Sequence, residues 1–167
     1  MHKYHIEHKR KKILSKLKLD KEQILNIQQN EDPYLFVDYA TEVVPGVSAK
    51  GYKKFEDNDW FFKVHWKNDP NVPGMLQIES LVQMSSLAIV TLPNNRKKIL
   101  YLVSANDIKF SKKITPGKTL FMETFIKSFK RGLANCEGYG YLDKSLACKA
   151  KFTLLLPDLL KSYSLKN

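Results

Sequence analysis

The chain has 167 residues, of which 43% are hydrophobic and 11% aromatic. This length and composition exclude a wholly disordered protein and predict one domain with its own hydrophobic core. Lysine and arginine total 28 against 17 aspartate and glutamate residues, so the formal net charge is +11 and anionic partners are favoured. Charge alone does not decide between nucleic acid, anionic lipid and an acidic protein.

The sequence contains no evident targeting or membrane-spanning segment. No apolar run follows the basic N-terminus, as a secretory signal would require, and polar residues interrupt the longest apolar stretch, 72–92. Cys136 and Cys148 do not form a CxxC pair, which fits a reducing compartment better than a disulfide scaffold. We therefore expect a cytoplasmic protein without a membrane span.

Three segments are predicted: a basic N-terminal extension over residues 1–18, a folded domain over residues 19–160 and a C-terminal tail over residues 161–167. Lysine and arginine dominate the extension, which we interpret as a solvated arm.

Two patterns occur within the extension. Histidine recurs there at every third position, but an arm offers no fixed geometry for ligands, so we expect no metal site. A short basic amphipathic helix is the alternative to a solvated arm. The histidines and the apolar face of that helix are His2, His5 and His8, and Ile13, Leu14 and Leu17.

The domain begins with a short helix that Asp20 is expected to cap. An extended segment over 34–38 and a strand over 48–55 follow, with a turn at Pro45-Gly46 between them. The aromatic run 60–62 is predicted to be a strand that leads to His65.

A helix of about five turns is predicted from Pro73 to Thr91, with apolar residues on most of its sides. A helix of that kind is buried on most sides. Only strand patterns follow, and they cover residues 99–103, 119–129, 133–142 and 146–154. One buried helix and consecutive strands predict an α+β fold, with the helix in the concavity of an antiparallel sheet.

Two residues stand out as candidates for catalysis. Glu79 is the only charged residue between Pro70 and Asn95, and burying a carboxylate is costly unless it is paired or neutralised. His65 is the only histidine after the first ten residues. Each alone has an ordinary structural explanation, but together they can supply an acid and a base. Gly74 opens the helix between them, where free backbone N–H groups suit a developing oxyanion.

The stretch from His65 to Gln83 resembles the histidine-to-glutamate signature of hotdog-fold 3-hydroxyacyl–acyl carrier protein dehydratases, GHFPGxPxxPGVLxxExxxQ. The matching positions are His65, Pro70, Pro73, Gly74, Leu76, Glu79 and Gln83. The flanking segments 32–38 and 108–117 resemble the family as well. Val64, Lys67, Asn68 and Asp69 depart from its pattern, and Asp69 is a possible ion partner for His65.

The resemblance implies a hotdog fold, a homodimer with two sites at the subunit interface and, in some members, a trimer of dimers. It implies that His65 of one subunit removes the α-proton of a 3-hydroxyacyl thioester and that Glu79 of the other protonates the leaving hydroxyl. Gly74 would polarise the thioester carbonyl, and Gln83 would orient the Glu79 carboxyl. No metal or organic cofactor is implied.

The substrate would be a thioester of acyl carrier protein or of coenzyme A. Because acyl carrier proteins are acidic, Lys109, Lys112 and Lys113 are weak candidates for docking one. Two alternatives keep the fold: an acyl thioesterase, and a non-catalytic subunit that binds acyl thioesters. Nucleic-acid binding is not expected, since no aromatic-and-basic recognition motif accompanies the arm.

Overall fold

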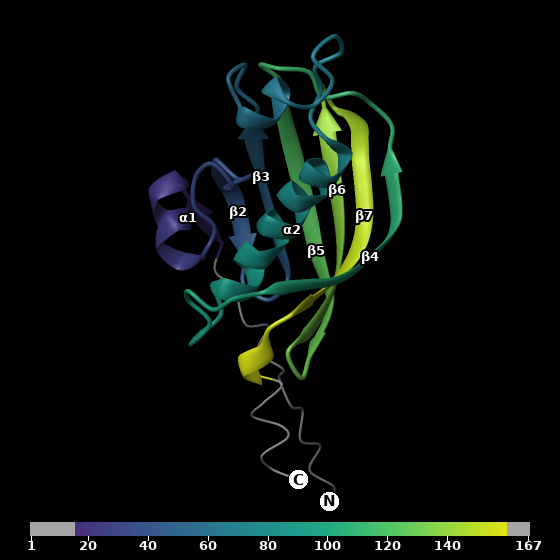
Figure 1. The fold of residues 1–167 in the computed structure, drawn as a ribbon. Helices are drawn as coiled ribbons and strands as arrows, with labels where there is room; N and C mark the ends of the chain where they lie inside the picture. Colours follow the sequence, from purple (N-terminus) through teal and green to yellow (C-terminus); the bar gives the residue numbers. More distant parts are fainter. Residues whose placement is uncertain (1–15, 160–167) are drawn as a thin grey trace, which may run out of the picture.

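The structure is a computed structural model, and it describes residues 16–159. The elements are β1 (Leu17–Leu19), α1 (Lys21–Ile27), β2 (Tyr39–Val44), β3 (Ser48–Lys54), the 3₁₀-helix η1 (Trp60–Lys63), α2 (Gly74–Val90), β4 (Tyr101–Phe110), β5 (Thr119–Lys130), β6 (Leu133–Leu142) and β7 (Ser145–Leu155). The seven strands form one antiparallel sheet in the order β1-β2-β3-β5-β6-β7-β4. The sheet curves around α2 (Figure 1), as expected for the predicted α+β hotdog arrangement.

The central helix is buried along most of its length. Thirteen of the 17 residues of α2 are buried, from Gln77 onward with Glu79 excepted, and they pack against the concave face of the sheet. Met75, which the periodicity places on the apolar stripe, is instead 58% exposed. The helix begins at Gly74, one residue later than predicted. Pro73 is the N-cap residue, since its ψ of 135° is extended rather than helical.

Two segments predicted to be extended or strand-like are not strands. Residues 34–38 form an irregular segment, although Leu35, Phe36 and Val37 are each 1% exposed, and β2 begins only at Tyr39. The run 60–62 lies in η1, where Phe61 and Phe62 are both buried. Neighbouring side chains of a strand face opposite sides, so two adjacent core residues favour a helical turn there.

The sheet begins inside the predicted N-terminal extension. Leu17 and Lys18 belong to β1, which pairs with β2 through Leu17 and Val43. The predicted extension is therefore too long at its C-terminal end. The histidine repeat, the apolar pair Ile13 and Leu14, and the tail 161–167 lie outside the described residues.

β4 forms one edge of the sheet and pairs on one side only, with β7. The strand is longer than the predicted 99–103, and nine of its ten residues are exposed. Its large apolar side chains, Tyr101, Leu102, Val103, Ile108 and Phe110, are 38% to 56% exposed. Within residues 16–159, no helix has both the length and the apolar composition needed to cross a bilayer.

Candidate active site

Glu79 lies in the N-terminal half of α2, where it is the one residue after Leu76 that is not fully buried. Burial raises the pKa of its carboxyl above the ordinary value of 4.5, while a hydrogen bond from Gln83 opposes part of that rise. A carboxyl group with a raised pKa is suited to donate a proton.

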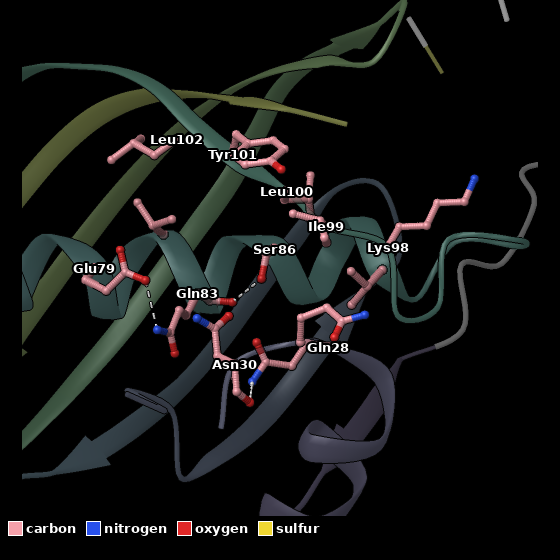
Figure 2. Close-up of a pocket in the computed structure, with 13 residues that line it drawn as sticks. Gln28, Asn30, Glu79, Gln83, Ser86, Lys98, Ile99, Leu100, Tyr101 and Leu102 are labelled. Carbon is pink, nitrogen blue, oxygen red and sulfur yellow. Dashed lines mark hydrogen bonds between the residues drawn. The ribbon is translucent and has the colours of Figure 1, made fainter. Parts of the chain in front are cut away.

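Gln83 holds this carboxyl group and the irregular segment 34–38 together. Its side chain is 2% exposed, and its Nε2 donates to Glu79 Oε1 and to the Tyr34 carbonyl, both at 2.9 Å. Its Oε1 accepts from the Phe36 backbone N–H at 2.8 Å. Three partners fix the orientation of the amide, and Figure 2 shows it beside Glu79. The contact between Gln83 and Glu79 that the resemblance implies is present.

Tyr34 also lies near this carboxyl group. Burial and, to a smaller extent, the charge of Glu79 raise the pKa of the Tyr34 phenol. The sequence does not predict this proximity, because it results from a tertiary contact: Gln83 donates to the Tyr34 backbone carbonyl and so holds Tyr34 near Glu79.

His65 follows η1, and its ring orientation is fixed from two sides. Nδ1 lies 3.1 Å from the Asn71 carbonyl oxygen, which can only accept, so Nδ1 carries the proton and Nε2 is left as a proton acceptor. The ring also stacks on Trp66, with centroids 4.4 Å apart and planes inclined by 20°. Neither the Asn71 carbonyl nor the Trp66 stack was identified from the sequence.

Asp69 does not serve as the ion partner of His65. Its carboxylate is instead paired with Lys113 Nζ. Lys113, one of the three candidate docking lysines, is therefore engaged with the loop that follows His65. Lys109 and Lys112 are exposed and have no ion-pair partner among residues 16–159.

Gly74 is the first residue of α2, and no side chain caps the N-terminus of that helix. A Cβ atom at this position would lie 2.8 Å from Phe110 Cζ, which is closer than carbon atoms approach without displacement. A side chain at position 74 would therefore displace the Phe110 ring, which lies over the start of the helix. The Leu76 N–H of the first turn donates to the Pro73 carbonyl at 2.9 Å, so the N–H groups of Gly74 and Met75 are those that can bind an oxyanion.

Some of the predicted site residues line one of two cavities of a single chain, whereas His65 lines neither and is represented only by its neighbour Trp66. Glu79 and Gln83 line a cavity of about 270 Å³ (Figure 2). Gly74, Lys112 and Lys113 line another of about 390 Å³, together with Trp66. Neither of these two cavities is lined by both Glu79 and the residues beside His65. One chain therefore does not bring the candidate acid and base together.

Comparison with known proteins identifies the family. The FabA-like domain matches residues 29–151 of the chain. The chain belongs to the FabA-like family.

Curated relatives of this FabA-like chain include proteins named "3-hydroxyacyl-[acyl-carrier-protein] dehydratase FabZ". The Bacillus velezensis protein is 33% identical over 140 residues, covering 84% of this chain and 99% of the relative. The Bacillus licheniformis protein is 31% identical over 140 residues, covering 84% and 97%. The Clostridium novyi protein is 33% identical over 138 residues, covering 79% and 94%. These matches confirm the predicted resemblance.

Solved structures agree in fold. The dehydratase heterocomplex ApeI:P from Xenorhabdus doucetiae gives a TM-score of 0.68 at 12% identity and covers 86% of this chain and 97% of that chain. An uncharacterized protein from Pyrococcus horikoshii gives a TM-score of 0.60 at 18% identity, with 78% and 91% covered. At these identities the likeness concerns the fold alone, and it confirms the predicted hotdog architecture.

Two departures from the FabA-like pattern are accommodated by the backbone. Val64 has φ −120° and its side chain is 74% exposed, so it needs none of the conformational freedom of glycine. The positive φ in this turn is adopted by Trp66, with φ 49°, and not by Asn68. That conformation costs a non-glycine residue about 1–2 kcal/mol. Its ring contact with His65 is one interaction that favours it.

Proposed function

We propose that this protein is a hydro-lyase that dehydrates 3-hydroxyacyl thioesters to trans-2-enoyl thioesters. The observation that carries the proposal is the Glu79 carboxyl, whose pKa is raised by burial and whose orientation is held by Gln83. The curated relatives, named as dehydratases, support the same reaction.

In the proposed reaction, Nε2 of His65 takes the α-proton and the electrons of that C–H bond form the new C=C bond. The bond from the β-carbon to the hydroxyl oxygen breaks, and the Glu79 carboxyl protonates the departing oxygen as water. The Gly74 N–H binds the thioester oxygen while negative charge develops on it. The proton on His65 returns to Glu79 before the next turnover, so the enzyme is unchanged.

The reaction requires a second copy of the chain, because Glu79 and the surroundings of His65 line different cavities of one chain. We propose that two chains associate along β4, whose outer edge is unpaired and whose apolar side chains are exposed. An exposed edge strand of this kind favours pairing with another strand. Each site would then take its base from one subunit and its acid from the other.

We further propose that the acyl group arrives on acyl carrier protein in the cytoplasm. Exposed Lys112 lines the cavity at Gly74, exposed Lys109 directly precedes Phe110 of its wall, and both suit an acidic partner. The free, buried Cys136 and Cys148 fit a reducing compartment.

The test is an assay of the purified protein with a 3-hydroxyacyl and a saturated acyl thioester, each on carrier protein and on coenzyme A. Enoyl formation from the 3-hydroxyacyl substrates without release of thiol is expected. Release of free thiol from both acyl groups would favour a thioesterase, and tight binding without conversion would favour a non-catalytic subunit. Either outcome would overturn the proposal.

A further inference from the structure

Trp66 directly follows His65 in the loop between η1 and α2, and its conformation is unusual for its residue type. Its φ of 49° lies in the left-handed region, which is unfavourable for a residue with a large side chain. Its side chain is 64% exposed, so burial in the core does not compensate for that conformation. A strained, exposed tryptophan beside the candidate base therefore needs an explanation outside the core.

The backbone of the turn does not select a tryptophan. The Trp66 carbonyl accepts from the Asp69 N–H at 2.8 Å, and this bond closes the turn. Every residue type offers the same carbonyl, and glycine or asparagine would adopt this φ at a lower cost. What tryptophan adds is its ring, which stacks on the His65 imidazole with centroids 4.4 Å apart and planes inclined by 20°.

The stack completes the support of the His65 ring. The hydrogen bond from Nδ1 to the Asn71 carbonyl, at 3.1 Å, holds one edge of the imidazole, and the indole of Trp66 covers one of its faces. A ring that is held at one edge and on one face cannot tilt without losing a contact. Nε2, the atom that takes the α-proton in the proposed reaction, therefore keeps a fixed direction. Such control matters because a misplacement of about 1 Å can reduce a rate about 10²-fold.

The stack also favours the charged form of the ring that the proposed reaction produces. When Nε2 takes the α-proton, the imidazole becomes a cation, and the face of an indole attracts a cation that lies over it. The carboxylate of Asp69, in the same loop, is paired with Lys113. Trp66 thus stabilises a charge that develops in the transition state and is absent from the bound substrate, which raises kcat and leaves binding nearly unchanged.

We propose that Trp66 is a positioning residue for the base, and that its ring orients the His65 imidazole and stabilises the cation that forms on it. This inference rests on the proposed dehydratase function and adds a residue to that site. Trp66 also lines the cavity at Gly74, so a direct contact with the substrate is the alternative that the experiment must separate.

The test measures stability, kcat and KM for Trp66→Asn and Trp66→Phe with a 3-hydroxyacyl thioester. Asparagine tolerates a positive φ and has no aromatic ring, so Trp66→Asn should unfold at about the wild-type temperature. Its kcat should fall about tenfold while KM changes less than about twofold. Trp66→Phe keeps an aromatic face and should restore kcat to within about threefold of wild type. A merely structural role would instead lower the unfolding temperature and kcat together, and would overturn the inference.

Trp60→Asn is the matched control, because it makes the same change at the other tryptophan of the chain. Trp60 lies in η1, is 43% exposed, and contacts the ring of Phe61 edge-on. Its replacement should leave kcat at the wild-type value. An equal fall of kcat in both tryptophan variants would overturn the specific role of Trp66.

A second measurement places Trp66→Asn in the His65→Ala background, where a residue that acts through His65 has no ring to position. The double variant should turn over at the rate of His65→Ala alone, within about twofold. A further loss of about tenfold, or a rise of KM in place of the fall of kcat, would show a direct substrate contact and overturn the inference while leaving the dehydratase in place. Unchanged kcat in Trp66→Asn would overturn it as well. If the wild-type protein converts no 3-hydroxyacyl thioester, the proposed function fails together with the inference.

Discussion

Gln83 Nε2 donates to Glu79 Oε1 at 2.9 Å and to the Tyr34 carbonyl at the same distance, so one amide connects the candidate acid to the segment that covers it. The spacing of four residues places both side chains on one face of α2. Because the amide is buried and its oxygen accepts from Phe36, it cannot turn away without leaving buried groups unpaired.

Replacing Gln83 by leucine should therefore reduce both stability and activity. The Phe36 N–H and the Tyr34 carbonyl would lose their partner, and each unpaired buried group costs about 1–3 kcal/mol. The activity should fall further than the loss of folded protein explains, because Glu79 would lose the donor that orients it. Urea unfolding together with kcat on the folded fraction separates the two effects. If kcat per folded enzyme stays at the wild-type value, Gln83 has only a structural role.

Glu79→Gln and His65→Ala should each reduce turnover by roughly 10²-fold or more while the fold is kept, which is typical of general acid–base groups. Glu79→Gln preserves an oxygen that can accept from Gln83, so circular dichroism and the melting temperature should change little. The matched control is Glu123→Gln, an exposed carboxylate in a surface ion pair with Lys50, which should retain full activity. A loss below about threefold in both site variants would favour a binding subunit.

The raised pKa of Glu79 makes stability depend on pH. Between pH 4.5 and the raised folded-state pKa, the carboxyl in the unfolded chain has mostly released its proton while most of the folded protein still holds it. The folded state then binds more protons, so the free energy of unfolding falls as pH rises from 4.5 through the raised folded-state pKa. The Glu79→Gln variant has no ionisable group at this position, so its free energy of unfolding does not fall with pH for this reason.

The free energy of unfolding of Glu79→Gln minus that of wild type should therefore increase as the pH rises from about 4.5 to about 8. Urea titrations at several pH values measure this difference, and Glu123→Gln corrects for the loss of a carboxylate in general. A difference that is constant or decreases over this range would contradict the burial of Glu79 as described.

Local patterns predicted α2, β6 and β7 closely, because a helix apolar on most sides and a strand with alternating burial repeat their signal over many residues. Residues 34–38 carry no such signal, because their side chains pack into the core through tertiary contacts, such as that of Phe36 with Phe61. β4 was predicted short since its exposed residues alternate weakly and its pairing with β7 is irregular.

The candidate site was likewise predicted only in part. The spacing from His65 to Glu79 and Gln83 is visible in the sequence, as is the glycine at the start of the helix. The partner of Asp69 was not predictable, because Lys113 lies 44 residues away and is one lysine among many.

The proposed dimer predicts that a charge on the outer part of β4 separates the subunits. Val103 is 56% exposed, and in a symmetric interface Val103→Glu would place like charges near one another. We expect a monomer with little activity, measured by sedimentation and by dehydration rate at micromolar concentration. Val47→Glu, at a 42% exposed valine in the turn after β2, is the matched control and should remain a fully active dimer. A wild-type monomer with full activity would exclude a shared site.

The basic surface beside the Gly74 cavity predicts a salt effect that depends on the carrier. The Debye length falls from about 10 Å at 0.1 M salt to about 3 Å at 1 M, so attraction between Lys109, Lys112 and an acidic carrier protein should be screened. The specificity constant for the carrier-linked substrate should therefore drop steeply with ionic strength. The same acyl group on a short uncharged thiol should respond little, because it needs only the cavity.

Reversing charge at Lys109 and Lys112 should reproduce the salt effect for the carrier-linked substrate alone, and sedimentation checks that the double variant stays a dimer, because Lys109 lies in β4. Both side chains are exposed and have no ion-pair partner among residues 16–159, whereas reversal at Lys113 would also break the pair with Asp69 beside His65. The control reverses the charge at Lys18, in β1, and at Lys130, the last residue of β5. This double variant has the same net charge as the first one, and its rate on the carrier-linked substrate should be nearly that of wild type. If both double variants slow the carrier-linked substrate equally, the effect belongs to net charge, and these lysines form an ordinary solvated surface.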